Sequence, residues 1–261
     1  MANTSKQQQS ATCYSNEGSE FQRESGHEFL QQLSPGRGSA ALDLGCGTGY
    51  LAAQLSECVG PEGKVVAVDP DEERLEIARE KYARDNIDYV SGNDASFPEG
   101  PYDLVFANHV IHWVSDKNAL FERVYQSLKP GGRFAFTTAN GVPAFPPVAK
   151  GCVGELFGPD FLEHLYHRRI LFLTCAQYQE LAVSHGFAVT SMEDRLLSSI
   201  PTGSVAHLVN FFFGLLHGEL DQEAISKEAI ENCKEKYDGD LRKEAEHCQT
   251  EKILHVILTK P

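Results

Sequence analysis

Apolar residues along the chain fall into short runs that alternate with longer stretches of mixed character. The runs are rich in Val, Leu, Ile, Phe and Ala, and their lengths and composition predict strands buried on both faces. The predicted strands are Ala40–Leu44, Lys64–Asp69, Ile87–Ser91, Tyr102–Ala107, Arg133–Ala139, Phe187–Ser191 and Ile253–Thr259.

The stretches between these runs carry apolar residues at helical spacing. In Asp71–Arg84, Leu75, Ala78 and Tyr82 share one helix face. Helices are predicted at Asn16–Leu33, Asp71–Arg84, Asp116–Leu128, Thr174–His185 and Glu219–Glu251, with Gly or Pro following several of them. Alternating strands and helices predict a parallel sheet with helices on both faces.

Two segments, 140–172 and 201–251, do not fit this alternation. They are predicted to form a helical cap over the carboxyl edge of the sheet, where ligands bind in such folds. Residues 1–12 are polar and are predicted to be a disordered tail. The rest, 13–261, is predicted to be one domain whose core comprises 36–139, 173–200 and 252–261.

Charge and composition narrow the classes of partner. The formal net charge of −14 argues against a nucleic-acid partner, because phosphate backbones are bound by Lys and Arg. The polar amino terminus does not resemble a secretory signal, and the apolar run Leu208–Leu216 is about half the length needed to cross a bilayer. Seven cysteines without a C-x-x-C pair predict free thiols, no metal site and a cytoplasmic location.

The candidate ligand site is the glycine-rich stretch Gly45-Cys46-Gly47-Thr48-Gly49, directly after the first predicted strand. It lacks the Lys of a phosphate-binding P-loop, and its third glycine comes one place too early for a dinucleotide fingerprint. Asp43, just before the glycines, would repel a pyrophosphate but suits a ligand with an ammonium group. S-adenosyl-L-methionine is a nucleoside with an ammonium group and no phosphate.

Five ordered motifs between Ala40 and Ala139 resemble a class I S-adenosylmethionine-dependent methyltransferase. They are LDLGCGTG, VVAVDP, SGNDASFP, YDLVFANHVIHWV and LKPGGRFAF. The resemblance implies a Rossmann-like, seven-stranded, mostly parallel α/β sheet whose last strand is antiparallel.

The resemblance also implies which residues bind the donor. The backbone at Gly45, Cys46, Gly47 and Gly49 would approach the donor closely, and Asp69, followed by Pro70, would accept from both ribose hydroxyls. Asp94 would accept from the adenine amino group, with Asn93 and the Ala95 N–H beside the ring. Asn108 and His109 would lie by the methionine part, and Tyr14 and Gln22 would close over the donor.

The acceptor is a small molecule whose identity the residues leave open. His109, His112 and Trp113 follow the fourth predicted strand and are the candidate catalytic residues; the alternative is that Trp113 packs under the next helix and His112 lies on the surface. A narrower resemblance to juvenile hormone acid and trans-aconitate methyltransferases implies O-methylation of a carboxylate. N-methylation of an amine and a catalytically silent binding protein are the alternatives. We expect a monomer or homodimer without a nucleic-acid or membrane partner.

Overall fold

The computed structural model describes residues 5–15, 19–142, 145–197, 203–216, 219–220, 225–247 and 251–261. Contacts divide the chain into two compact units. The sheet unit comprises Gln22–Gly141, Leu171–Arg195 and Lys252–Pro261, and the helical unit comprises Met1–Phe21, Val142–Ile170 and Leu196–Glu251. Each unit is described by itself.

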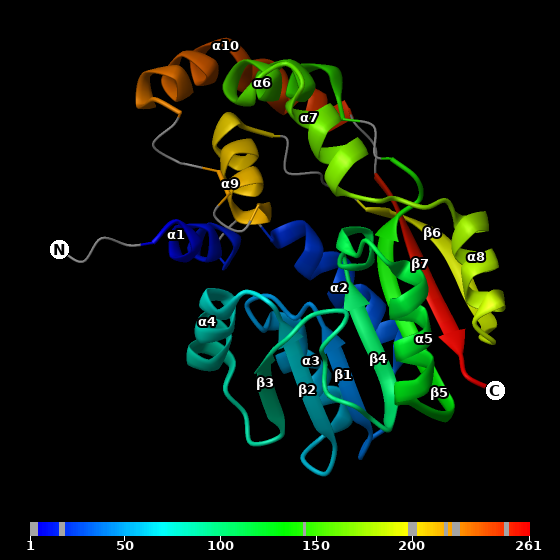
Figure 1. Cartoon of the computed structure of the whole chain (residues 1–261). Helices are drawn as coiled ribbons and strands as arrows, with labels where there is room; N and C mark the ends of the chain where they lie inside the picture. Colours follow the sequence, from blue (N-terminus) through cyan, green and yellow to red (C-terminus); the bar gives the residue numbers. More distant parts are fainter. Residues whose placement is uncertain are drawn as a thin grey trace. The chain divides into compact units, whose positions relative to one another are not determined.

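Seven strands form one sheet in the order β3-β2-β1-β4-β5-β7-β6 (Figure 1). Strands β1 to β5 pair in parallel, and β7 pairs antiparallel with β5, which confirms the Rossmann-like fold expected from the motifs. The strands are β1 (Ala40–Leu44), β2 (Lys64–Asp69), β3 (Ile87–Ser91), β4 (Tyr102–Asn108), β5 (Leu128–Ala139), β6 (Ala188–Leu197) and β7 (Glu251–Thr259).

Two helices that follow β2 and β4 begin at side-chain caps that the sequence already displays. Asp71 accepts from the Glu73 and Arg74 N–H groups at the start of α4, and Asp116 accepts from the Ala119 N–H at the start of α5. The helices of the sheet unit are α2 (Glu20–Leu33, whose first two residues belong to the helical unit), α3 (Tyr50–Val59), α4 (Glu72–Tyr82), α5 (Lys117–Ser127) and α8 (Cys175–Ser184).

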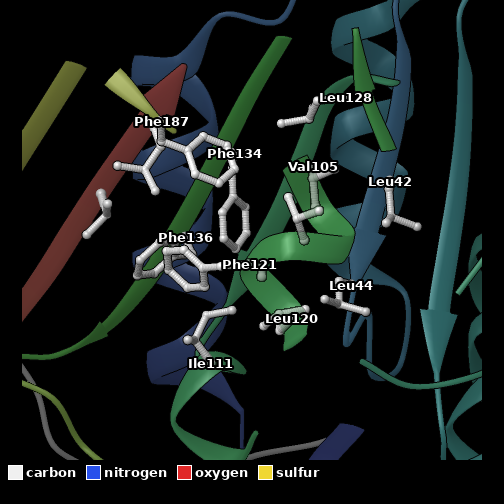
Figure 2. Packing of buried hydrophobic residues seen from close by; sticks show 14 of the residues in the cluster. Leu42, Leu44, Val105, Ile111, Leu120, Phe121, Leu128, Phe134, Phe136 and Phe187 are labelled. Carbon is white, nitrogen blue, oxygen red and sulfur yellow. The ribbon is translucent and has the colours of Figure 1, made fainter. Parts of the chain in front are cut away.

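Apolar side chains fill both faces of the sheet. On one face Phe121 of α5 packs edge-on against Phe134 and Phe136 of β5, at centroid distances of 5.4 and 6.0 Å (Figure 2). On the other face, the ring centroids of Phe29 of α2 and Phe106 of β4 lie 6.1 Å apart. Because both faces are covered, the carboxyl ends of β1, β2 and β4 are held rigidly, and the candidate residues follow these ends.

The helical unit contains α1 (Lys6–Cys13), α6 (Pro147–Phe157), α7 (Phe161–His164), the turn Leu165–Arg169, α9 (Val205–Leu215) and α10 (Lys227–His247). These include the residues expected to form the cap; its placement over the sheet edge stays a prediction. In the described ranges, no helix is both long and apolar enough to cross a membrane.

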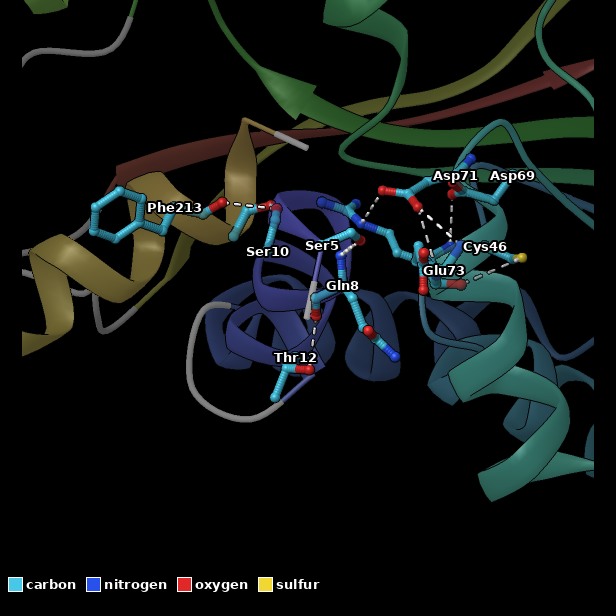
Figure 3. A network of polar contacts seen from close by, with 12 residues as sticks. Ser5, Gln8, Ser10, Thr12, Cys46, Asp69, Asp71, Glu73 and Phe213 are labelled. Carbon is cyan, nitrogen blue, oxygen red and sulfur yellow. Dashed lines mark hydrogen bonds and ion pairs between the residues drawn. The ribbon is translucent and has the colours of Figure 1, made fainter. Parts of the chain in front are cut away.

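Residues 6–13 differ from the expected disordered tail, because they form helix α1. Ser5 caps it by accepting from the Gln8 N–H, and the Ser10 hydroxyl donates to the Phe213 carbonyl of α9 at 2.8 Å (Figure 3). A side chain at Gly214 of α9 would lie 3.1 Å from the Tyr14 backbone. Small residues therefore let α1 pack closely on α9, a signal that hydrophobic periodicity does not carry.

Candidate functional site: a donor-binding loop at the sheet's carboxyl edge

The turn from β1 into α3 depends on glycine at three positions. Gly45, Gly47 and Gly49 have φ angles of 74°, 55° and 85°, in the left-handed region that other residues rarely adopt. A Cβ at Gly45 would lie 2.2 Å from Val110 Cγ2, and one at Gly49 would lie 2.7 Å from Ala78 Cβ. The loop therefore has no side chain at these three positions, and its conformation excludes a β-branched residue.

Asp69, at the end of β2, holds this loop in place. Its carboxylate is 4 % exposed; Oδ2 accepts from the Gly47 N–H at 2.8 Å and Oδ1 accepts from the Asp71 N–H at 2.9 Å (Figure 3). A carboxylate offers about four acceptor positions. Each oxygen thus keeps acceptor capacity for a ribose hydroxyl, while Asp69 also has a structural role that the sequence did not reveal.

Asp43 of β1 is a buried carboxylate with an unused oxygen. The residue is 1 % exposed, and Oδ2 has no hydrogen-bond partner in the described part of the chain. Burial, and secondarily the charge of Asp69, raises the pKa of Asp43 to about 7. Leaving such a group without a partner is costly, and a cationic ligand group is the partner that would relieve the cost.

The predicted adenine-binding segment is a compact turn after β3. The Asn93 side chain accepts from the Ala95 N–H at 2.9 Å and from the Ser96 hydroxyl at 2.9 Å. The Ala95 N–H expected at the adenine ring therefore already has a partner. The Asp94 carboxylate is half-buried and makes no hydrogen bond within the described ranges, so it is available as an acceptor.

Asn108 at the end of β4 forms one hydrogen bond with helix α2 and one with strand β5. The Asn108 amide donates to the Gln22 carbonyl at 2.8 Å and accepts from the Thr137 hydroxyl at 2.8 Å. A Cβ at Gly26 would lie 2.9 Å from Asn108 Cγ, which explains how α2 comes so close. The side-chain oxygen of Gln22 is buried and lacks a partner among the described residues.

His109 is held in an unusual backbone conformation just after β4. Its φ is 56°, its N–H donates to the Thr137 hydroxyl at 3.0 Å, and its ring Nε2 lies 3.3 Å from the Ser25 hydroxyl. Burial, with a smaller effect of His255, lowers the pKa of His109 to about 3. The imidazole is therefore neutral at physiological pH and is a weak base.

His112 is buried, which contradicts the alternative expectation that this residue lies on the surface. It lies in the short 3₁₀ turn Ile111–Trp113, is 7 % exposed and stacks on Phe172 with centroids 4.9 Å apart. Burial lowers its pKa well below the usual value, with smaller effects of His109 and Lys117. Trp113 is half-buried, with its ring 5.9 Å from that of His112.

The sheet unit thus contains every predicted donor and catalytic residue except Tyr14, which belongs to the helical unit and whose donor contact stays a prediction. Sequence reasoning missed Ser25, Thr137 and Thr138, whose hydroxyls hold His109 and His112. Two consecutive threonines ending the apolar strand β5 were a usable signal, because buried hydroxyls need partners.

The residues fit S-adenosylmethionine on grounds internal to the structure. The buried Asp43 oxygen and the buried Gln22 oxygen both lack partners in the described ranges. Three of the five loop positions carry no side chain, and the Asp69 carboxylate retains acceptor capacity. Among the described residues, no group of three or more His, Cys, Asp or Glu side chains is placed to bind a metal ion.

The central segment of the chain is similar in sequence to known methyltransferases. Residues 42–136 match the family model described as a methyltransferase domain. Demethylmenaquinone methyltransferase of Lactococcus lactis is 40 % identical over 109 residues, which cover 40 % of this chain and 43 % of that protein. The ubiquinone/menaquinone biosynthesis C-methyltransferase of Escherichia coli is 39 % identical over 120 residues, covering 44 % and 47 % respectively. The matches span less than half of either relative.

Solved structures share the fold over most of the chain. A methyltransferase solved in complex with the Haloferax volcanii Trm112 activator matches with a TM-score of 0.63 and 16 % identity, covering all of both chains. Phosphoethanolamine N-methyltransferase 2 of Haemonchus contortus matches with a TM-score of 0.59 and 21 % identity, covering 91 % of this chain and 52 % of that one. At these identities the likeness establishes the fold. Over residues 42–136 the chain is similar to the methyltransferase domain family.

Proposed function

We propose that the protein binds S-adenosyl-L-methionine in its sheet unit and transfers the methyl group to a small-molecule acceptor, with a carboxylate as the acceptor group. The buried, unpartnered Asp43 carboxylate behind the glycine loop supports donor binding. The methyltransferase-domain match over residues 42–136 supports the same activity. Two structural relatives were solved with S-adenosylmethionine or its analogue sinefungin, which is consistent with this donor.

Each part of the donor has a chemically matched group in the sheet unit. Asp43 would neutralise the ammonium group, and Asp69 would accept from the ribose hydroxyls with the lone pairs that the loop leaves free. Asp94 would accept from the adenine amino group. When bound, S-adenosylmethionine supplies an electrophilic methyl group on a sulfonium sulfur.

The low basicity of the two histidines supports a carboxylate acceptor. A general base works best when its pKa lies near the working pH. The pKa of His109 is about 3, and that of His112 is also far below neutrality. A carboxylate is ionised at neutral pH and needs no base, only orientation. His109 and His112 would then orient the acceptor as neutral hydrogen-bonding groups.

The narrower resemblance to juvenile hormone acid and trans-aconitate methyltransferases supports the same acceptor class. The similarity to the curated relatives favours a different one, methylation at carbon, because one of them is described as a C-methyltransferase. Carbon methylation of a hydroxylated ring requires loss of the phenolic proton, and therefore a base. We keep C-methylation as the second candidate, and N-methylation of an amine as a further outcome of the same test.

A labelled-methyl assay separates these acceptors. The purified chain is incubated with radiolabelled S-adenosylmethionine and panels of carboxylic acids, amines and dihydroxylated aromatic compounds. Methyl esters release labelled methanol in mild alkali, whereas N-methyl and C-methyl products keep their label. We expect alkali-labile product, absent in the Gly47→Val variant. Alkali-stable product would contradict the carboxylate proposal, and no product with any panel would contradict methyl transfer itself.

A further inference from the structure

The helical unit contains a cavity that the donor-binding residues do not explain. Its volume is about 400 Å³, and it lies between α6, the turn after α6, α7 and the turn Leu165–Arg169. All of its lining residues belong to the helical unit. Cavities of this size hold small organic ligands.

Two glycines keep the cavity open along one face of α6. Gly154 would meet only the Pro159 Cα, at 3.8 Å, if it carried a Cβ, and Gly158 would meet nothing within 4 Å. Lys150 lies one helical turn before Gly154 and so shares this face. The neighbouring face of α6 packs on α10, where Glu155 pairs with Lys236 at 2.6 Å. Helix α6 therefore has one packed face and one open face.

Aromatic and aliphatic side chains form the walls. The Phe145 and Tyr166 rings lie 6.4 Å apart at 44°, and Leu162 of α7 is nearly buried. Other phenylalanines of this unit pack on one another, for example Phe157, which stacks on Phe161 with ring centroids 4.8 Å apart. Two rings beside a glycine floor suit a flat ring, because small residues allow close approach.

Two opposite charges line the same cavity without partners in the described part of the chain. Lys150 lies on α6 and Glu163 lies on α7, and neither side chain takes part in an ion pair or hydrogen bond there. Some charged side chains of this unit pair with each other, as in Lys236–Glu155 and Arg169–Glu219. A ligand with one carboxylate and one ammonium group would match both charges.

We propose that this cavity binds a small aromatic zwitterion, a molecule with one ring system, one carboxylate and one ammonium group. The ring packs against the edges of Phe145 and Tyr166, above the glycines. The carboxylate pairs with Lys150 and the ammonium group pairs with Glu163. This binding does not depend on methyl transfer, so it stands or falls separately from the proposed function.

Saturation-transfer NMR and calorimetry on the full chain test the proposal with three matched probes. L-tryptophan carries both charged groups, indole-3-propionate carries only the carboxylate, and tryptamine carries only the amine. We expect L-tryptophan to bind at least about threefold more tightly than either single-charge probe, as two partly exposed ion pairs allow. Failure of L-tryptophan to bind, or equal affinity for all three probes, would overturn the proposal.

Four variants locate the site. Lys150→Met should weaken the binding of L-tryptophan and indole-3-propionate about threefold and leave the binding of tryptamine unchanged. Glu163→Gln should weaken the binding of L-tryptophan and tryptamine about threefold and leave the binding of indole-3-propionate unchanged. Gly154→Leu should fill the cavity and abolish all binding, with Tm kept or raised because leucine favours the helix. Lys227→Met, at an exposed position of α10, is the matched control and should change nothing.

Binding of S-adenosylhomocysteine should be the same in all four variants and wild type. This readout separates a failed cavity proposal from a failed donor site. L-tryptophan binding that survives Gly154→Leu, or that ignores both charge variants, would show that the ligand binds elsewhere and would overturn the assignment.

Discussion

Protonation of Asp43 should control the affinity of the donor site. The pKa of this buried carboxyl is about 7, so the group is largely protonated at pH 5.5 and largely ionised at pH 7.5. If only the ionised form pairs with the ligand ammonium, the observed affinity scales with the ionised fraction. That fraction changes about 25-fold between pH 5.5 and 7.5, or about 1.9 kcal/mol at 1.36 kcal/mol per pKa unit.

Calorimetry with S-adenosylhomocysteine across this pH range measures the effect. With an α-amino pKa of about 7.7–8.0, the ligand ammonium group is fully protonated at pH 5.5 and still mostly protonated at pH 7.5, so its own titration changes the affinity by less than about twofold. Asp43→Asn should bind more weakly at pH 7.5 and lose the pH dependence. The affinity of the wild-type protein for 5′-methylthioadenosine, which lacks the ammonium group, should also be independent of pH in this range.

Protons released on binding give a second readout. Binding that pulls Asp43 to its ionised form near pH 7 should release a fraction of a proton, so the measured heat should vary with the ionisation enthalpy of the buffer. A wild-type affinity that stays flat from pH 5.5 to 7.5 would refute the reasoning. So would an Asp43→Asn variant that keeps the wild-type slope.

The remaining predictions concern the loop and the histidines. Asp69→Ala should weaken S-adenosylhomocysteine by about 2–3 kcal/mol in calorimetry and also lower Tm, because the carboxylate holds two loop N–H groups; an unchanged affinity would contradict its ribose role. Gly47→Val should stay soluble but lose donor binding, since its φ of 55° excludes a β-branched residue; normal turnover would disprove this. His109→Gln should cost at most about tenfold in kcat/KM, about 1.4 kcal/mol, without changing the pH–rate profile; a larger loss restored at high pH would indicate a base. The pKa of the buried His255 falls from 6.5 to about 4 on folding, so the wild-type protein loses stability as the pH drops through that range. His255→Phe should therefore raise the free energy of unfolding relative to wild type by about 2 kcal/mol at pH 5 and hardly at pH 7.5. Equal shifts of Tm at both pH values would contradict this prediction.

The strands of the parallel sheet could be predicted from the sequence because each contains a short apolar run. Strands β1 and β4 are buried on both faces, whereas the edge strand β3 is only partly buried. The ranges of β1, β2 and β3 agree with the predicted runs, and Asp71 and Asp116 marked the starts of α4 and α5. Such runs and caps are local properties of the chain. Strand β5 begins earlier than expected, at Leu128, because the Pro-Gly-Gly segment that ends α5 already continues into the strand.

The hydrogen-bond partners at the site could not be predicted, because they arise from tertiary contacts. Nothing local shows that Asp69 accepts from the Gly47 N–H, or that the Ala95 N–H is already bonded to Asn93. The burial that lowers the pKa of His109 comes from elements distant in sequence. Sequence motifs therefore indicate which residues gather at the sheet edge, and the structure decides which of their atoms remain free for a ligand.

Equilibrium binding of S-adenosylmethionine to the full chain at pH 7.5 tests the central claim most directly. The account predicts saturable binding of one donor molecule per chain, weakened by Asp43→Asn and abolished in a folded Gly47→Val variant. A folded wild-type protein that does not bind the donor at millimolar concentration would contradict it. Undiminished binding to Gly47→Val would contradict it equally.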